Sequence, residues 1–342
     1  MGRLSLRAAV PSTGSADRAL WTVLSRLRED VHVTTPERAS ALSRILPGII
    51  GLLGSKRMFA SADRTMRRAR EQLVRPQSFA PPRSLERHVD VSIRHENGWP
   101  IYTVGPRTGA SSRRAVYIHG GAWINEISSF HWRLIADFAA STGTEITVPI
   151  YPLVPRAEAT AENVVGVIAD LAASIVARVG GRNVVLLGDS AGGTIALSVA
   201  HLLRDRGVPS PRDVVLISPV IDMRFTDPEI YRIEPSDPWL DVPGPRAAGE
   251  RWRGDLDITD SRVSPAFGPL GGLGRISLFT GTRDITHADA ITLERKAAEE
   301  EHPLDVHRAP GMIHVYPLLP IPEGAAAREA IRQVLRRDAP ID

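Results

Sequence analysis

One serine, Ser190, lies in the stretch GDSAGG at 188–193, after the apolar run 184–187 and before a helical pattern. A serine that leaves a strand and enters a helix within one residue needs a strained backbone, and Gly188 and Gly192 let both elements pass closely around it. The hydroxyl would project above the sheet, near the N–H groups of the helix N-terminus. An ordinary strand–helix turn is the alternative. We predict that Ser190 is a catalytic nucleophile.

A serine hydroxyl needs a general base, and that base needs an orienting carboxylate. Downstream of Ser190, the apolar run 276–281 is followed by Asp284, and the run 304–309 is followed by His314. Both residues would lie beyond the carboxyl end of a strand, at the same edge as Ser190, in the order acid then histidine. We therefore predict His314 as the base and Asp284 as its orienting acid. The other candidates are placed less well, at helix ends or within a strand: Asp289, His287, His302 and His307.

The first apolar run of the parallel series ends in HGGAW at 119–123. Attack on an acyl carbon creates an oxyanion, and glycines let backbone N–H groups face it without a Cβ in the way. A tight turn is the more ordinary reading of a Gly-Gly pair alone. Together with the serine motif, the pair predicts an oxyanion hole made by the N–H groups of Gly120, Gly121 and Ala191.

These residues require a sheet that brings several strand ends together. A hairpin is expected at 89–103 around Asn97-Gly98, where β-branched residues alternate with polar ones. Short apolar runs then alternate with helical patterns, which predicts a mostly parallel, doubly wound α/β sheet with helices on both faces. The expected strands are 115–120, 146–151, 184–188, 214–219, 276–281 and 304–309, and the expected helices are about 127–142, 158–179, 193–207, 287–301 and 322–338.

Two segments do not fit this alternation. Residues 1–80 have helical periodicity, with an apolar stripe that we expect to break at Pro47-Gly48 and a further helix at 61–74. A Pro-rich linker at 76–84 follows. Residues 222–264, rich in Pro, Trp and Asp, are expected to form an excursion above the sheet.

The combination of HGGAW and GDSAGG resembles the hormone-sensitive-lipase-type branch of the α/β-hydrolases, the bacterial family IV carboxylesterases. Asp284, GMIH at 311–314 and YPLVP at 151–155 lie where this branch has its acid, its histidine and its YRLAPE stretch. The similarity covers about 85–340, the expected catalytic domain. It implies an α/β-hydrolase fold with a helical cap, for which 1–80 and 222–264 are the two matching segments.

The sequence departs from that family pattern at a few positions. Ala122 replaces the commoner third glycine of the oxyanion loop, and Asp284-Ile285-Thr286 stands where Asp-Pro-Leu is usual. Pro152 and Arg156 differ from the YRLAPE pattern. Two N–H donors of the Gly-Gly pair are still expected to be available.

Composition excludes several other classes of function. The chain has no cysteine, which removes disulfides, thiolate nucleophiles and thiolate metal sites. Its net charge is +3, and its arginines are dispersed, so nucleic-acid binding is not expected. A phosphate loop at 48–56 is not expected, because these glycines follow a predicted helix and not a strand. A dinucleotide site at 271–274 is not expected either, because these glycines precede a predicted strand. No metal site, cofactor, signal peptide or membrane span is expected, and the predicted location is cytoplasmic.

The residues and the resemblance together predict a serine carboxylesterase that hydrolyses short- to medium-chain esters. Lactones and amides use the same machinery and stay open as substrates. A catalytically silent small-molecule binder on the same fold is the alternative from another class. The apolar residues at 46–53, bordered by Arg44, Lys56 and Arg57, also leave open a contact between the cap and a lipid surface. Homodimerisation is left open too.

Overall fold

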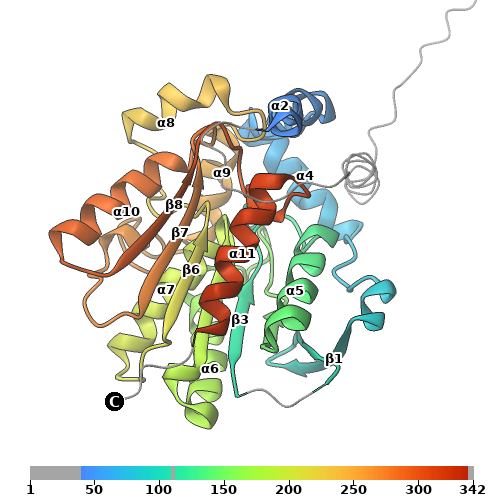
Figure 1. The fold of residues 1–342 in the computed structure, drawn as a ribbon. Helices are drawn as coiled ribbons and strands as arrows, with labels where there is room; N and C mark the ends of the chain where they lie inside the picture. The colour runs from blue at the N-terminus through green and yellow to red at the C-terminus, as the bar shows by residue number, and fades with distance from the viewer. Residues whose placement is uncertain (1–39, 109–111, 338–342) are drawn as a thin grey trace, which may run out of the picture.

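A single eight-stranded sheet forms the centre of the molecule (Figure 1). The computed structural model describes residues 40–108 and 112–337. The strand order is β1-β2-β4-β3-β5-β6-β7-β8, with β1, β2 and β4 paired antiparallel and all other pairs parallel. The strands are β1 Val89–Glu96, β2 Trp99–Pro106, β3 Arg114–Ile118, β4 Glu145–Pro149, β5 Val184–Asp189, β6 Asp213–Ile217, β7 Arg275–Gly281 and β8 Leu304–Ala309. The predicted doubly wound sheet is confirmed.

Side chains of the central strands alternate between two cores, one on each face of the sheet. In β5, Val184 and Leu186 belong to one core, and Val185 and Leu187 belong to the other. None of the four is more than 2% exposed. Because neighbours on a strand point to opposite faces, a strand covered on both sides is apolar at every position. This explains the uninterrupted apolar run before Ser190.

Five long helices cover the two faces. The core that contains Val185 is closed by α5 and α11, and the core that contains Val184 is closed by α6, α7 and α10 (Figure 1). Their bounds are α5 Ser129–Thr142, α6 Ala161–Val179, α7 Ala191–Asp205, α10 His287–Glu299 and α11 Pro322–Arg336. Helix α7 begins at Ala191, directly after Ser190 and two residues earlier than expected. Gly192 and Gly193, which weaken the helical pattern of the sequence, therefore belong to the first turn of α7.

Three helices of the N-terminal segment are described: α2 Ala41–Leu53, α3 Ser55–Phe59 and α4 Ala62–Val74. The expected break at Pro47-Gly48 is wrong, because α2 continues through Pro47. Proline inside a helix costs about 3 kcal/mol. Burial of Leu46 and Ile50, at 1% and 2% exposure on one face of α2, offsets that cost. The helix ends at Leu53 and is capped by Gly54, whose φ of 78° is left-handed. Residues 1–39 of the predicted cap segment lie outside the described residues.

The N-terminal segment and the insertion 222–264 pack against each other. The insertion carries α8 Pro228–Ile233 and α9 Pro243–Trp252, and α9 lies against α4 (Figure 1). At Gly244 of α9, a Cβ would come within 2.6 Å of Thr65 Oγ1 and 2.7 Å of the Phe59 backbone. The two segments assigned to a cap therefore form one packed layer. Their role in covering a substrate stays a prediction.

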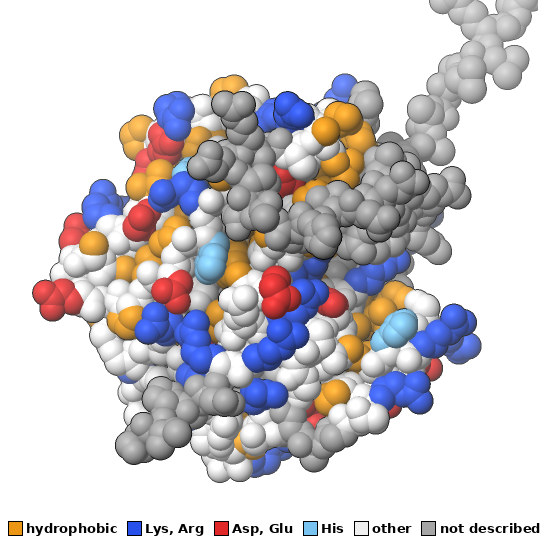
Figure 2. All heavy atoms as spheres, viewed as in Figure 1, with side chains coloured by type: hydrophobic (Ala, Val, Ile, Leu, Met, Phe, Trp, Pro, Cys, Tyr) orange, Lys and Arg blue, Asp and Glu red, His pale blue; other side chains and the backbone are white. Residues whose placement is uncertain are grey.

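Basic residues are spread over the surface. Figure 2 shows Lys and Arg side chains interspersed with Asp and Glu on the face turned to the viewer. Many arginines are paired, as in Arg332–Asp137 at 2.6 Å and Arg262–Asp260 at 2.7 Å. The basic surplus is thus not gathered into one stripe on this face. Within the described part of the chain, no helix is both long enough and apolar enough to cross a bilayer.

Candidate active site

Ser190 sits on a sharp turn between β5 and α7. Its backbone has φ 50° and ψ −123°, a conformation that L-residues rarely adopt. The turn is compact because glycines allow the chain to come close to itself. A Cβ on Gly192 would lie 2.0 Å from the Ile118 carbonyl oxygen, and one on Gly188 would lie 2.2 Å from the Gly192 carbonyl oxygen. The strained elbow expected from the motif is present.

The structure brings Ser190, His314 and Asp284 together from the ends of three strands. His314 Nε2 is 2.9 Å from Ser190 Oγ, and His314 Nδ1 is 2.9 Å from Asp284 Oδ2. A carboxylate can only accept, so Nδ1–H donates to Asp284 and leaves Nε2 to accept the Ser190 hydroxyl proton. The exposed fractions are 9% for Ser190, 4% for His314 and 0% for Asp284.

The local charges shift the pKa values of His314 and Asp284 in opposite directions. Burial lowers the pKa of His314, but the charge and hydrogen bond of Asp284 outweigh it, so the pKa lies above its ordinary value. Burial raises the pKa of Asp284, and the charge of His314, its hydrogen bond and the Thr286 N–H reverse this, leaving the pKa lowered. Asp284 also accepts from the Thr286 N–H at 3.0 Å. It therefore stays ionised beside a basic imidazole.

A second buried carboxylate, Asp237, comes from the insertion 222–264. Its Oδ2 accepts from the N–H of Ile285 at 3.0 Å, next to Asp284, and its Oδ1 accepts from the N–H groups of Trp239 and Leu240. Burial raises the pKa of Asp237 to about 6, and the charge of Asp284 adds to this. The Trp239 ring meets the His314 ring edge-on at 6.3 Å. Sequence reasoning missed both residues, because nothing in the motifs indicates which loop meets the triad.

The alternative acid and bases have partners of their own. Asp289 accepts from the N–H of Asp222 at 3.2 Å, and burial raises its pKa well above the ordinary value. His287 contacts Thr280 Oγ1 at 3.0 Å. His302 bonds the Gly274 carbonyl, and the His307 ring stacks on Phe279. His314 and Asp284 are thus the pair that reaches Ser190.

The oxyanion loop differs from the expectation at one donor. The Gly120 N–H already donates to Asp189 Oδ1 at 3.0 Å. It therefore cannot also point at an acyl oxygen, which corrects its predicted role. Within the described residues, the N–H groups of Gly121, Ala122 and Ala191 donate to no other group. Ala122 has a φ of 52°, so the loop tolerates a side chain where a third glycine is common.

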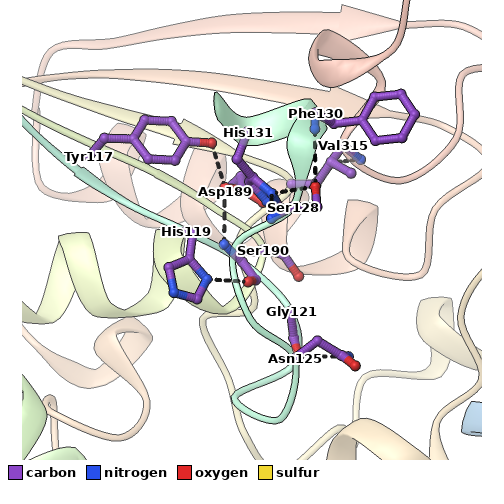
Figure 3. Close-up of polar contacts among 12 residues, drawn as sticks. Tyr117, His119, Gly121, Asn125, Ser128, Phe130, His131, Asp189, Ser190 and Val315 are labelled. Atoms are coloured by element: carbon purple, nitrogen blue, oxygen red, sulfur yellow. Dashed lines mark hydrogen bonds and ion pairs between the residues drawn. The ribbon is translucent and has the colours of Figure 1, made fainter. Parts of the chain in front are cut away.

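Asp189 anchors a buried network behind the serine (Figure 3). Besides the Gly120 N–H, its carboxylate accepts from Tyr117 Oη at 2.6 Å and contacts His131 Nε2 at 3.2 Å. The Ser128 N–H donates to His131 Nδ1 at 3.0 Å, so Nε2 carries the proton that faces Asp189. Burial raises the pKa of Asp189, but His131, Tyr117 and Gly120 bring it below its usual range. Asp189 lies inside the serine motif, yet only the fold reveals its partners.

An arrangement of this kind can carry out acyl transfer by a serine. A serine hydroxyl and an imidazole bonded to a carboxylate meet beyond the carboxyl ends of the strands. In the ranges 40–108 and 112–337, no three His, Asp or Glu side chains are grouped so that they could hold a metal ion.

Comparisons with known proteins place the fold in a family. Residues 115–318 match a family model described as alpha/beta hydrolase fold. The chain is 37% identical over 258 residues to a triacylglycerol lipase of Mycobacterium tuberculosis, covering 75% of this chain and 54%, about half, of that lipase. It is 30% identical over 233 residues to an acetyl-hydrolase of Streptomyces hygroscopicus, covering 66% of this chain and 75% of the relative.

Solved structures share the same architecture. A structure from Staphylococcus aureus aligns with a TM-score of 0.77 at 27% identity, covering 84% of this chain and 97% of that one. A hormone-sensitive lipase from a metagenome library aligns with a TM-score of 0.72 at 20% identity, covering 88% and 99%. The chain belongs to the α/β-hydrolase family.

Proposed function

We propose that the protein hydrolyses carboxylic esters with Ser190 as nucleophile, His314 as general base and Asp284 as orienting acid. The observation that carries this proposal is the unbroken pair of 2.9 Å contacts from Asp284 through His314 to Ser190. The strained backbone at Ser190 supports it, because such strain is found at catalytic nucleophiles.

The oxyanion is bound by the N–H groups of Gly121, Ala122 and Ala191, in place of the set that included Gly120. Three features support this revision: the Gly120 N–H is engaged by Asp189, the other three are unengaged within the described residues, and Ala191 opens helix α7. A helix N-terminus favours negative charge, which adds to the donors.

The reaction follows from these positions. His314 Nε2 takes the Ser190 proton as Oγ attacks the acyl carbon, and negative charge moves to the carbonyl oxygen. Asp284 stabilises the imidazolium that forms. The imidazolium then protonates the leaving alkoxide oxygen, so the C–O bond breaks and an acyl-serine remains. A water molecule, deprotonated by His314, releases the acid and restores Ser190.

The substrates are short- to medium-chain esters. The name of the acetyl-hydrolase relative supports the short end of this range, and that of the lipase relative supports longer chains. Trp239 from the insertion meets the His314 ring edge-on, where it limits the space around the acyl group. Each methylene that fits an apolar site lowers the activation free energy that corresponds to kcat/KM by an amount on the order of 1 kcal/mol.

The test is hydrolysis of p-nitrophenyl acetate, butyrate, octanoate and palmitate by the wild type and by Ser190→Ala. We expect activity that is highest on the shorter chains and reduced by about 10⁴-fold or more in the variant. A Ser190→Ala variant with activity within tenfold of the wild type would remove Ser190 from its role. Equal rates on all four chains would contradict the chain-length preference alone.

A further inference from the structure

We propose that Asn125 and Gln72 are positioning residues that orient the oxyanion donors, so that helix α4 of the N-terminal segment controls the rate of acyl transfer. This inference rests on the proposed hydrolase function and deepens it. Neither residue touches the reacting atoms. Both act through the peptide that joins Gly121 to Ala122.

Three successive carbonyls of the oxyanion loop are each held by a side chain. The Tyr151 hydroxyl donates to the His119 carbonyl at 2.7 Å, and His119 Nδ1 donates to the Gly120 carbonyl at 2.7 Å. The Asn125 side-chain amide then donates to the Gly121 carbonyl at 3.1 Å, as Figure 3 shows. The loop is therefore fixed peptide by peptide.

Peptide planarity converts these contacts into control of the donors. In a trans peptide, the C=O of one residue and the N–H of the next point in opposite directions. Holding the Gly121 carbonyl therefore aims the Ala122 N–H away from Asn125. Holding the Gly120 carbonyl likewise aims the Gly121 N–H. The Gly121 carbonyl also accepts from the Asn125 N–H at 2.9 Å and the Ile124 N–H at 3.1 Å, so Asn125 supplies two of its three donors.

Gln72 determines which end of the Asn125 amide faces Gly121. Gln72 Nε2 donates to Asn125 Oδ1 at 3.2 Å, which leaves the Asn125 Nδ2 group toward the loop. In the reversed orientation, Oδ1 would face the Gly121 carbonyl oxygen and two acceptors would oppose each other. Gln72 thus fixes a side chain that could otherwise adopt either orientation.

The position of α4 depends on the rest of the N-terminal segment and on the insertion. Met66 and Ala69 of α4 are buried at 8% and 1% exposure in the same core as Ile124. Thr65 of α4 lies against Gly244 of α9. Movement of this packed layer would therefore move Gln72 relative to Asn125. Through the Gln72–Asn125 hydrogen bond, the position of this layer therefore affects the orientation of the oxyanion donors.

The variants Asn125→Asp and Gln72→Glu remove the two hydrogen bonds with little change in shape. The carboxylate introduced by Asn125→Asp cannot donate to the Gly121 carbonyl, and the carboxylate introduced by Gln72→Glu cannot donate to Asn125. The matched control is Gln333→Glu, the same charge change at an exposed position of α11. All variants are made in the full chain, with melting temperature and circular dichroism as folding checks.

We expect Asn125→Asp to lower kcat on p-nitrophenyl butyrate by about 10- to 100-fold, part of the roughly 10²- to 10³-fold loss seen when an oxyanion donor is removed. Gln72→Glu should lower kcat by a smaller factor. KM should change by less than about threefold, since the contact matters mainly in the transition state. The affinity for a trifluoromethyl ketone, which forms a tetrahedral adduct with serine, should fall in parallel with kcat/KM. A merely structural role would lower the melting temperature without this parallel.

The coupling is tested in an Asn125→Ala background. Because Gln72 acts through Asn125, Gln72→Glu should have no further effect on kcat there. An equal effect of Gln72→Glu in both backgrounds would overturn the coupling. Folded Asn125→Asp with kcat within threefold of the wild type would overturn the inference alone. A wild type that hydrolyses none of the esters would instead overturn the proposed function.

Discussion

Replacing Asp284 by Asn tests how the triad works with almost no change in shape. Asp284 is fully buried, its Oδ2 faces His314 Nδ1 at 2.9 Å, and Oδ1 accepts from the Thr286 N–H at 3.0 Å. The Thr286 N–H holds the amide oxygen of Asn at the Oδ1 position, so the amide NH₂ group faces His314. That group donates to Nδ1, which places the imidazole proton on Nε2. Nε2–H cannot accept the proton of Ser190.

The size of the loss follows from the tautomer. An imidazole that presents Nε2–H to the serine is no base, and the analogous change in a Ser-His-Asp protease lowers kcat about 10⁴-fold. We expect a loss of roughly 10³- to 10⁴-fold in kcat for Asp284→Asn, equal to about 4–5.5 kcal/mol of transition-state stabilisation. The assay is steady-state hydrolysis of p-nitrophenyl butyrate, with the melting temperature as a check on folding.

Asp289→Asn is the matched control and also tests the alternative acid. Burial raises the pKa of Asp289 well above its ordinary value, which favours its neutral form, and Asn resembles that form closely. We expect kcat within about threefold of the wild type, as for a substitution that touches no reacting group. If Asp289→Asn were the more damaging of the two, the assignment of Asp284 would be refuted.

Three further predictions concern pH and packing. Because neutral His314 is the base and Asp284 holds its pKa above the ordinary value, kcat/KM should fall as pH decreases through a midpoint above about 6.5; a midpoint well below this would contradict the ion pair. Gly192→Ala should destabilise the fold by at least ~1–3 kcal/mol in urea unfolding, because the Cβ would lie 2.0 Å from the Ile118 oxygen, whereas Gly166→Ala in α6 has open space and should stabilise slightly. Leu46→Ala, at a 1% exposed site, should cost about 2–5 kcal/mol, and Ile45→Ala, at 61% exposure, should change stability by less than about 0.5 kcal/mol.

The sheet and the meeting of the triad residues could be predicted from the sequence. Strands buried on both faces leave continuous apolar runs, and the carboxyl ends of parallel strands share one edge. Ser190, Asp284 and His314 each follow such a run, so their proximity depends little on side-chain detail. The Asn97-Gly98 hairpin could be predicted for a similar local reason, since both residues adopt positive φ.

The direction of single N–H groups could not be predicted. Gly120 and Gly121 are adjacent and identical, yet one N–H is engaged by Asp189 and the other is not. That difference depends on the backbone angles of the loop and on where β5 ends. Asp237 was missed because its contact with Ile285 joins residues 48 positions apart through an irregular loop.

The path of α2 through Pro47 shows the limit of local signals. Proline alone predicts a break, and the loss of one hydrogen bond is real. Burial of Leu46 and Ile50 compensates for it, since both residues belong to the core that also contains Val185 and Val315. Tertiary packing therefore overrides the helix-breaking effect of Pro47.

Covalent labelling by a fluorophosphonate probe tests the central claim most directly. The probe reacts with a serine only where a base and oxyanion donors activate the hydroxyl. After incubation at neutral pH, proteolysis and mass spectrometry would locate the adduct. The account predicts one adduct, on the peptide that contains Ser190, with no labelling of Ser190→Ala and much slower labelling of Asp284→Asn. An unlabelled wild type, or an adduct on another residue, would contradict it.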